Sequence, residues 1–306
     1  MQHPEPEWPV NFDRTLHLGE EPEFCVSMPP EGIVDRNITC PDSYGHPDTI
    51  ALRPASPSAD TGYRTGTDQS HSIHMRLLSV GVVTPLGNER SGIKSFMDEV
   101  LEHLQPQDRW YCVLDKVSTD GTREIVAARA KIDQRVVYVW APQNQCVVDA
   151  YFVGYEAAYA AGCNWILEMD AGFSHPPSKI PEFIAAMTAG YDYVGGSRFM
   201  TGGAHRSPWT RRCLSYGGTF LARTLLGSKM TDMTSGYECF NRLAMEHVLR
   251  CRVRSRANFF QTEIRHMMHR FRWKEIPIVY VNDHSRVGRR AIGESLGVLL
   301  QMAFQK

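Results

Sequence analysis

The stretch from Leu77 to Leu104 reads LLSVGVVTPLGNERSGIKSFMDEVLEHL, an apolar run followed at once by a helical pattern. Residues 77–83 form the run and suit a buried strand. Beyond it, apolar residues recur at i, i+3, i+4, i+7, i+8 and i+11 on one helix face: Ile93, Phe96, Met97, Val100, Leu101 and Leu104. The stretch therefore predicts a strand that leads directly into an amphipathic helix.

The same alternation of strand and helix continues along the chain. Further strands are predicted at 110–114, 136–140, 165–169 and 191–194, and helices after Gly121, over 150–161 and after Ser178. Strands that alternate with helices in this way pair mostly in parallel and are covered on both faces. We therefore expect an α/β fold over residues 75–306, with a mostly parallel central sheet and helices on both faces.

Residues 1–74 differ in composition from the rest of the chain. They are rich in proline, and no helical or strand period persists in them. We expect an N-terminal extension that is either disordered or laid over the domain. The first residues, MQHPEPEWPV, lack the basic start and apolar core of a signal peptide, and no window approaches the ~18 consecutive apolar residues of a membrane span. The default expectation is a cytoplasmic protein, either free or peripheral to a membrane.

The net charge of -1 conceals an asymmetry along the chain. Residues 1–75 hold 4 Lys and Arg against 12 Asp and Glu, whereas residues 196–306 hold 19 against 7. An arginine-rich last third attracts phosphates on a nucleotide, a lipid head group or a nucleic acid, although a solvated basic face is the plainer interpretation. The eight cysteines form no CxxC pair, so we expect thiols rather than a zinc site or disulfides.

Polar loops follow three of the predicted strands. They read TPLGNE at 84–89, DKVSTDGT at 115–122 and EMDAGFSHP at 168–176. Because ligands of parallel sheets bind beyond the carboxyl ends of the strands, we expect the carboxylates of these loops on one rim of the sheet. One such loop is easily explained as a turn or a helix cap, but three in register favour a binding site.

These motifs, in this order, resemble the family-2 glycosyltransferases of the GT-A (Rossmann-like) fold, and within them the dolichyl-phosphate or polyprenyl-phosphate mannose synthase branch. The match continues with GSRF at 196–199, DMTSGY at 232–237, FQTE at 260–263 and EIPI at 275–278. Single matching residues are Gly202, Gly203, Trp209, Arg211 and Ser215. The resemblance covers roughly residues 76–285. It implies a GT-A glycosyltransferase domain and a hexosyltransferase that depends on a nucleotide sugar.

The resemblance also implies which residues bind the sugar donor. Asp115 resembles the aspartate that contacts the donor base, and Asp170 resembles the first aspartate of the metal motif. Mg²⁺ or Mn²⁺ bound there would bridge Asp170 to the diphosphate of a GDP- or UDP-linked sugar. The other residues implied to bind the donor are Thr84, Pro85, Glu89 and Asp120.

On the acceptor side, the resemblance points to Arg198, Arg211 and Ser215 as residues that hold a phosphate. The planar fork of arginine suits a phosphate group. Asp232 and Gln261 lie in motifs of the same side. Asp170, Arg198 and Asp232 are the residues implied to be catalytic, and Asp232 is the candidate base if the acceptor is a hydroxyl.

The sequence departs from the family pattern at two aspartates. Gly172 stands where the second metal aspartate is usual, and Lys116 replaces the second aspartate of the DD pair. Glu168 lies two residues before Asp170, on the same face of the predicted strand, and is the candidate for the missing metal ligand. The donor sugar and the nucleotide base stay open.

The favoured hypothesis is transfer of a hexose or related sugar, with inversion, to a polyprenyl-phosphate-type acceptor. An anionic phosphate needs no general base, whereas a hydroxyl does. The basic last third keeps a nucleic acid open as the acceptor, such as a hydroxymethylated base in phage-type DNA, and a glycan hydroxyl is a further alternative. The remaining alternative is a non-catalytic module that binds sugar nucleotides, which the glycine at position 172 favours.

Overall fold

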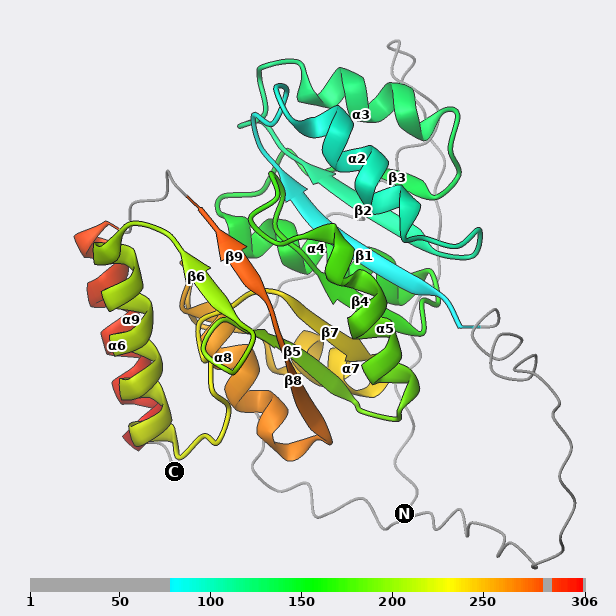
Figure 1. The fold of residues 1–306 in the computed structure, drawn as a ribbon. Helices are drawn as coiled ribbons and strands as arrows, with labels where there is room; N and C mark the ends of the chain where they lie inside the picture. The colour runs from blue at the N-terminus through cyan, green and yellow to red at the C-terminus, as the bar shows by residue number, and fades with distance from the viewer. Residues whose placement is uncertain (1–77, 283–287, 305–306) are drawn as a thin grey trace, which may run out of the picture.

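The computed structural model describes residues 78–282 and 288–304. The extension predicted for residues 1–74, and the domain boundary expected at residue 75, lie outside the described residues. The described part has one central sheet with helices on both of its faces and a pair of helices at one edge (Figure 1).

The central sheet has seven strands in the order β3-β2-β1-β4-β7-β5-β8. They are β1 (Val80–Leu86), β2 (Arg109–Leu114), β3 (Val136–Trp140), β4 (Trp165–Glu168), β5 (Tyr193–Ser197), β7 (Glu238–Asn241) and β8 (Trp273–Pro277). Neighbouring strands are parallel, except that β7 runs antiparallel to both β4 and β5. A second, two-stranded sheet pairs β6 (Ala204–Arg206) with β9 (Val279–Val281). The mostly parallel sheet predicted from the sequence is confirmed, with β7 as the exception.

Helices connect the strands and close the fold. The α-helices of the described residues are α2 (Ile93–Glu102), α3 (Thr122–Ala130), α4 (Val147–Ala160), α5 (Ile180–Thr188), α6 (Trp209–Leu226), α7 (Arg242–Cys251), α8 (Phe260–Met267) and α9 (Arg289–Phe304). Short 3-10 turns precede α5 and follow α8, at η1 (Pro177–Lys179) and η2 (Met268–Arg270). Within the part of the chain that the structure describes, none of the helices is both long and apolar enough to cross a membrane.

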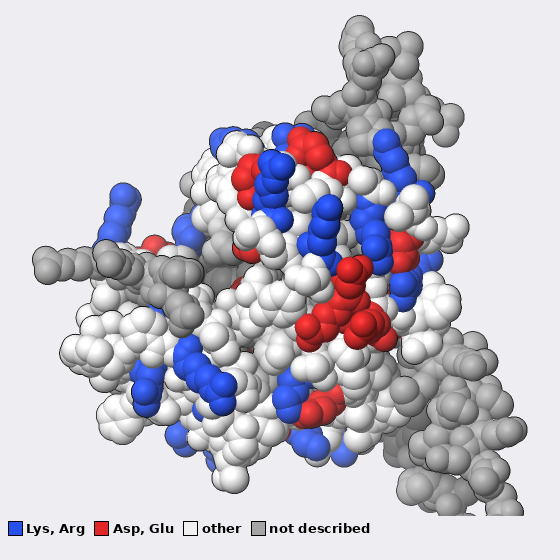
Figure 2. Space-filling view, turned by 45° about the horizontal axis from the view of Figure 1, so that its top comes forward, with Lys and Arg blue, Asp and Glu red and all other residues white. Residues whose placement is uncertain are grey.

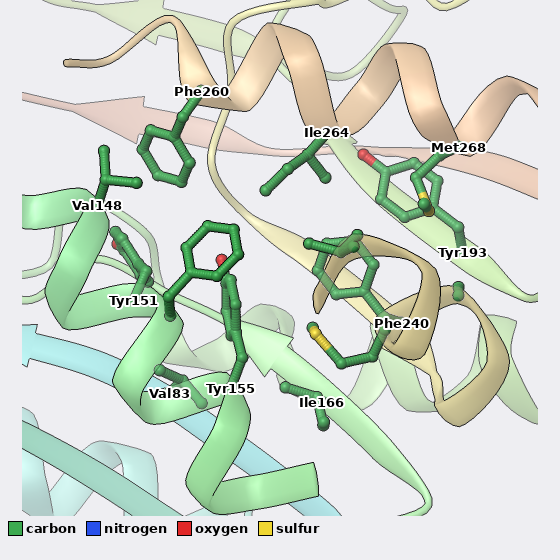
Figure 3. Close-up of a cluster of buried hydrophobic side chains, with 14 of the residues drawn as sticks. Val83, Val148, Tyr151, Tyr155, Ile166, Tyr193, Phe240, Phe260, Ile264 and Met268 are labelled. Carbon is green, nitrogen blue, oxygen red and sulfur yellow. The ribbon is translucent and has the colours of Figure 1, made fainter. Parts of the chain in front are cut away.

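The sheet separates two hydrophobic cores because its side chains alternate between the faces. In β2, Trp110, Cys112 and Leu114 belong to the core beneath α2 and α5, whereas Tyr111 and Val113 belong to the core beneath α4, α7 and α8. Figure 3 shows the second core, in which tyrosines of α4 and apolar side chains of α8 meet over Phe240 of β7. The loops that follow the strands are thus supported by packed helices on both faces of the sheet.

One glycine allows α4 to approach the sheet closely. A side-chain carbon added at Gly154 would lie 2.2 Å from Val83 Cγ1 and 3.0 Å from Val113 Cγ2. Contacts this short cannot exist between real carbon atoms, so only glycine permits the observed packing of α4 on β1 and β2.

The first strand lies further along the chain than the sequence pattern predicts. The prediction places it at 77–83, with Thr84 and Pro85 in the following loop, but β1 spans Val80–Leu86 and includes both residues. The strand was predicted to end before Pro85 because proline lacks a backbone N–H and is rare inside central strands. Pairing of β1 with β4 ends at Val83, so Pro85 lies where β1 pairs with β2 alone.

Candidate active site

The loops after β1 and β2 meet at the carboxyl edge of the sheet, as the sequence predicts. The side chain of Asn88 donates to Val117 O at 3.1 Å and accepts from Thr119 N at 2.9 Å. Arg90 N donates to Asp120 Oδ2 at 2.9 Å. These contacts hold the two loops together at the rim.

The two aspartates of the β2 loop organise its backbone. Asp120 Oδ1 accepts from Thr122 N at 3.0 Å and from Thr122 Oγ1 at 2.6 Å, at the start of α3. Asp115 Oδ1 accepts from Val117 N at 2.8 Å. Asp115 remains partly exposed, so its second oxygen is available for the predicted contact with the donor base.

Two residues of the β1 motif occupy different environments. Thr84 is fully buried, and its hydroxyl accepts from Trp110 Nε1 at 3.0 Å, so its side chain serves packing in this conformation. Glu89 is half-buried; burial raises its pKa, and the charges of Asp120 and Asp170 add to the rise. A side-chain carbon added at Gly172 would lie 3.1 Å from Glu89 Oε2. Glu89 therefore places a carboxylate beside the position where the family pattern has its second aspartate.

Asp170 lies just after β4 and is held by two neighbours. Tyr151 of α4 donates its hydroxyl to Asp170 Oδ1, and Asp170 N donates to His175 Nδ1 at 3.0 Å. His175 is buried and stacked on Tyr237, with ring centroids 4.8 Å apart. Burial lowers the His175 pKa to about 4, so the ring is neutral at pH 7 and shapes the loop as an acceptor.

Glu168, the predicted second metal ligand, points into the protein. Its carboxylate accepts hydrogen bonds from the Tyr155 hydroxyl and from Gln261 Nε2, and the residue has no exposed surface. Burial raises its pKa well above the usual value, and Glu238, its cross-strand partner on β7, raises it further. In this conformation Glu168 offers a cation no ligand atom, because its oxygens are enclosed and partnered.

Asp232, the candidate base, is saturated by hydrogen bonds. Arg198 donates to it from Nε, at 2.7 Å from Oδ2, and from Nη2, at 2.8 Å from Oδ1. Thr234 N donates to Oδ1 at 3.0 Å. Burial alone would raise the Asp232 pKa, but the charge and hydrogen bonds of Arg198 outweigh it and leave the pKa lowered. A carboxylate so stabilised is a poor proton acceptor. Its geometry is that of a residue that orients Arg198.

A second buried arginine supports the loop that carries Asp232. Arg265 of α8 donates to Glu238 Oε1 at 2.7 Å, to Asp232 O at 2.5 Å and to Gly196 O at 2.9 Å. Glu275 of β8 accepts from the backbone N–H groups of Thr231, at 2.6 Å, and Asp232, at 3.0 Å. Arg265, two residues beyond the FQTE motif, and Glu275, the first residue of the EIPI motif, thus hold the 231–235 loop in place.

A cavity of about 90 Å³ brings Asp170, of the predicted donor side, together with residues of the predicted acceptor side. Four predicted site residues line it: Asp170, Arg198, Arg211 and Gln261. The other lining residues are Val147, Tyr151, His175, Thr234, Ser235, Gly236, Asn258, Phe260 and Tyr280. Ser215, predicted to bind the acceptor, is buried on α6 one turn beyond Arg211 and is not among the lining residues.

Several buried polar atoms of this cavity have no partner among the described residues. They are Ser235 Oγ, Gln261 Oε1 and Arg211 Nε. Buried polar groups are normally hydrogen-bonded, so orphaned ones that line a cavity fit a polar ligand. Together with the Arg198 guanidinium and the Asp170 carboxylate, they suit a ligand with phosphate and hydroxyl groups.

The sequence reasoning missed the tyrosines of the site. Tyr151 and Tyr155 of α4 donate hydrogen bonds to Asp170 and Glu168. Tyr280 of β9 lines the cavity beside Arg198, whose guanidinium lies 5.4 Å from the ring centroid. Tyr151 and Tyr155 are four residues apart, which is enough to predict that they share one face of α4. The sequence does not indicate that this face packs against the loop after β4.

Comparison with known sequences identifies the family of this chain. The profile of glycosyl transferase family 2 matches residues 81–249. A polyprenol monophosphomannose synthase of Mycolicibacterium smegmatis is 32% identical over 212 residues, which cover 68% of this chain and 79% of the relative. An undecaprenyl-phosphate mannosyltransferase of Micrococcus luteus is 28% identical over 228 residues, covering 72% and 91%.

Solved structures show the same fold. The glucosyl-3-phosphoglycerate synthase of Mycobacterium tuberculosis, solved with Mn²⁺, uridine diphosphate and phosphoglyceric acid, superposes with a TM-score of 0.57 at 16% identity. The match covers 79% of this chain and 85% of that one. The expectations of a GT-A fold and of an enzyme are confirmed. This chain belongs to glycosyl transferase family 2, and it is a glycosyltransferase.

Proposed function

We propose that this glycosyltransferase moves a hexose or related sugar from a nucleotide-sugar donor to the phosphate of a polyprenyl-phosphate-type acceptor, with inversion. The observation that carries the proposal is the placement of Arg198 and Arg211 in one cavity with Asp170. Arginine recognises phosphate oxygens through its charge and its fork of N–H donors. Arg198 uses its Nε and Nη2 on Asp232, so it would contribute its charge and Nη1, while Arg211 would contribute its fork. The cavity's orphaned polar atoms supply further contacts. The names of both relatives above refer to polyprenol or polyprenyl derivatives.

The donor would bind at the rim formed by the loops after β1, β2 and β4. Asp115 would contact the base, and Asp170 would hold a divalent cation together with the donor diphosphate. Mg²⁺ commonly takes one or two protein carboxylates and completes its shell with phosphate oxygens and water, which fits the partly exposed Asp170. Such a cation would neutralise charge on the departing diphosphate.

The transfer needs no general base on this account. An oxygen of the acceptor phosphate attacks the anomeric carbon, and the bond from that carbon to the donor diphosphate breaks with both electrons leaving on the diphosphate. Because the attacking phosphate is already anionic, no proton has to be removed. That agrees with Asp232, whose carboxylate is occupied by Arg198 and has a lowered pKa.

The nucleic-acid alternative loses part of its support. Two of the arginines that motivated it are paired with acids of α4: Arg252 contacts Glu156 and Arg256 contacts Asp149, each at 2.6 Å. Part of the basic charge of the last third therefore neutralises acidic charge of the middle third.

Conservative substitutions of the arginines test the proposal. Arg198→Lys and Arg211→Lys should raise the KM for a short-chain polyprenyl phosphate or lower kcat by about tenfold or more. Lysine lacks the bidentate fork by which Arg198 is held on Asp232 and which Arg211 would offer the phosphate. Donor binding, measured by calorimetry with Mn²⁺, should survive. Arg212→Lys is the matched control, because Arg212 is the exposed neighbour outside the cavity. Equal kinetics in all three variants would contradict the proposal.

A further inference from the structure

Helices α6 and α9 expose an apolar surface at one edge of the molecule. On α6, Trp209, Cys213, Tyr216 and Phe220 recur at i, i+4, i+7 and i+11, which places them on one face. On α9, Ile292, Leu296, Leu300 and Phe304 recur every four residues, and all of them are exposed. The exposed fractions reach 73% for Trp209, 71% for Phe220 and 84% for Phe304. We call these eight residues the α6–α9 surface. All of them except Cys213 are large apolar side chains, and such side chains gathered on a protein surface mark an interaction site.

Both helices already bury their opposite faces. Thr219 of α6 is buried and accepts from Met233 N at 3.2 Å, while Val298 and Leu299 of α9 are buried in the core. Helices α6 and α9 pack against each other at one edge of the molecule, away from the central sheet (Figure 1). The α6–α9 surface is therefore left over after each helix has packed within the described part of the chain.

The charges around this surface are positive. Helix α6 carries Arg211, Arg212 and Arg223 and no acidic residue. Helix α9 carries one acid, Glu294, whose carboxylate accepts from Ser255 Oγ at 2.9 Å and from Arg256 N at 2.6 Å. On the face shown in Figure 2, blue Lys and Arg lie among white side chains on the left, where these helices lie, with little red beside them. Aromatic and aliphatic residues beside arginines are typical of helices that lie in a membrane interface.

We propose that the α6–α9 surface docks the enzyme on a lipid bilayer that contains anionic phospholipids. Apolar side chains would enter the head-group and acyl boundary, and the arginines would meet lipid phosphates. A second copy of the chain fits less well, because a two-fold contact would bring identical arginines together with no acid opposite them.

Docking there would present the acceptor to the active site. This step rests on the proposed function. Arg211 lines the cavity, and Trp209 and Arg212 of the same helical turn are exposed outside it. A polyprenyl chain can therefore stay in the bilayer while its phosphate reaches Arg211 and Arg198.

Vesicle binding tests the docking directly, without catalysis. The full chain is mixed with vesicles of phosphatidylcholine, with and without phosphatidylglycerol, and the bound fraction is measured by sedimentation. We expect binding that increases with phosphatidylglycerol and weakens with salt. Phe220→Glu and Leu296→Glu should each lower the partition coefficient about tenfold or more. Ile132→Glu is the control, because Ile132 is 80% exposed just beyond the end of α3.

Quenching by brominated lipid locates the contact. The fluorescence of Trp209 is the part of the tryptophan signal that is lost in the Trp209→Phe variant. Brominated phosphatidylcholine should quench this part of the signal. Absence of binding to either vesicle, or equal binding of the wild type and Phe220→Glu, would overturn the proposal. So would a dimer that Phe220→Glu dissociates, since the surface would then belong to a second copy. Unquenched Trp209 would also overturn it, because the surface would then be covered by something other than lipid.

Kinetics separates this proposal from the proposed function. Phe220→Glu should keep its kcat/KM for a short-chain, water-soluble polyprenyl phosphate and lose about tenfold or more toward a long-chain acceptor held in vesicles. If vesicles bind but no polyprenyl phosphate is glycosylated, docking stands and the proposed acceptor is wrong. If both acceptors are used equally well by Phe220→Glu, docking has no part in the reaction and this step fails.

Discussion

Replacing Asp232 by Asn distinguishes an orienting carboxylate from a general base. In the structure Asp232 accepts from Arg198 N, Nε and Nη2 and from Thr234 N and Oγ1, all within 3.3 Å. Asparagine keeps the shape and one acceptor oxygen but removes the charge and turns an amide N–H toward an Arg198 donor. The substitution therefore leaves the buried Arg198 without its counter-ion.

The expected loss follows from this geometry. Removing one member of a buried ion pair typically costs about 3–5 kcal/mol. Because asparagine retains one acceptor oxygen, we expect the unfolding free energy to fall by about 3 kcal/mol, at the lower end of that range. The substitution should affect turnover only because it displaces Arg198. We expect kcat to fall by about tenfold and the KM for polyprenyl phosphate to rise. Loss of a general base would instead reduce kcat by about 10²- to 10⁴-fold.

Two measurements on the same preparations decide between these outcomes. Urea unfolding gives the free-energy change, and steady-state kinetics with a short-chain polyprenyl phosphate gives kcat and KM. Thr234→Val is the matched control: it removes a hydroxyl 2.6 Å from Arg198 Nη2 but keeps the charge pair, so it should cost about 1 kcal/mol. A kcat reduced more than about 10²-fold at unchanged stability would refute the orienting role.

Four further substitutions have defined outcomes. Asp170→Asn should abolish Mn²⁺-dependent binding of nucleoside diphosphate in calorimetry, whereas Glu168→Gln should preserve it; loss of the metal dependence in a stable Glu168→Gln protein would restore Glu168 as a ligand. The His175 pKa is lowered to about 4 by burial, so between about pH 6.5 and 4 the unfolded state binds more protons and stability should fall as pH falls. In urea titrations at pH 7 and 5, His175→Asn should reduce that dependence, and an unchanged slope would contradict the assignment. Gly154→Ala should lower the unfolding free energy by about 1–3 kcal/mol, because its new carbon would meet Val83 Cγ1 at 2.2 Å; a thermal midpoint equal to the wild type would show that the backbone relaxes freely.

The sequence predicted the parallel part of the fold well because apolar runs and helical periods are local signals. The strand predicted at 136–140 matches β3, and the predicted helical face from Ile93 matches the buried residues of α2. The antiparallel β7 carries no comparable local signal: its four residues, ECFN, gain their place only by pairing with β4 and β5. Strand direction is set by tertiary contacts, which a single sequence does not display.

The sequence predicted some of the residues that line the cavity, but not how those residues are held. The motifs correctly brought Asp170, Arg198 and Arg211 together, because each follows or flanks a sheet element at one edge. The role given to Glu168 relied on strand alternation, which indicates a face of the strand but not what covers that face. Tyr155 and Gln261, from two helices distant in sequence, enclose the Glu168 carboxylate. Such enclosure depends on packing between helices, and no spacing rule predicts it.

Transfer of label from donor to acceptor tests the central claim most directly. Purified protein is incubated with Mn²⁺, with radiolabelled GDP- and UDP-linked hexoses, and with three acceptors in parallel: a short-chain polyprenyl phosphate, DNA with hydroxymethylated bases, and a glycan. We predict that the label moves to the polyprenyl phosphate with inverted anomeric configuration, and that Arg198→Lys abolishes most of this transfer. Label on DNA or glycan with none on the polyprenyl phosphate would contradict the account, as would donor hydrolysis without transfer to any of the three.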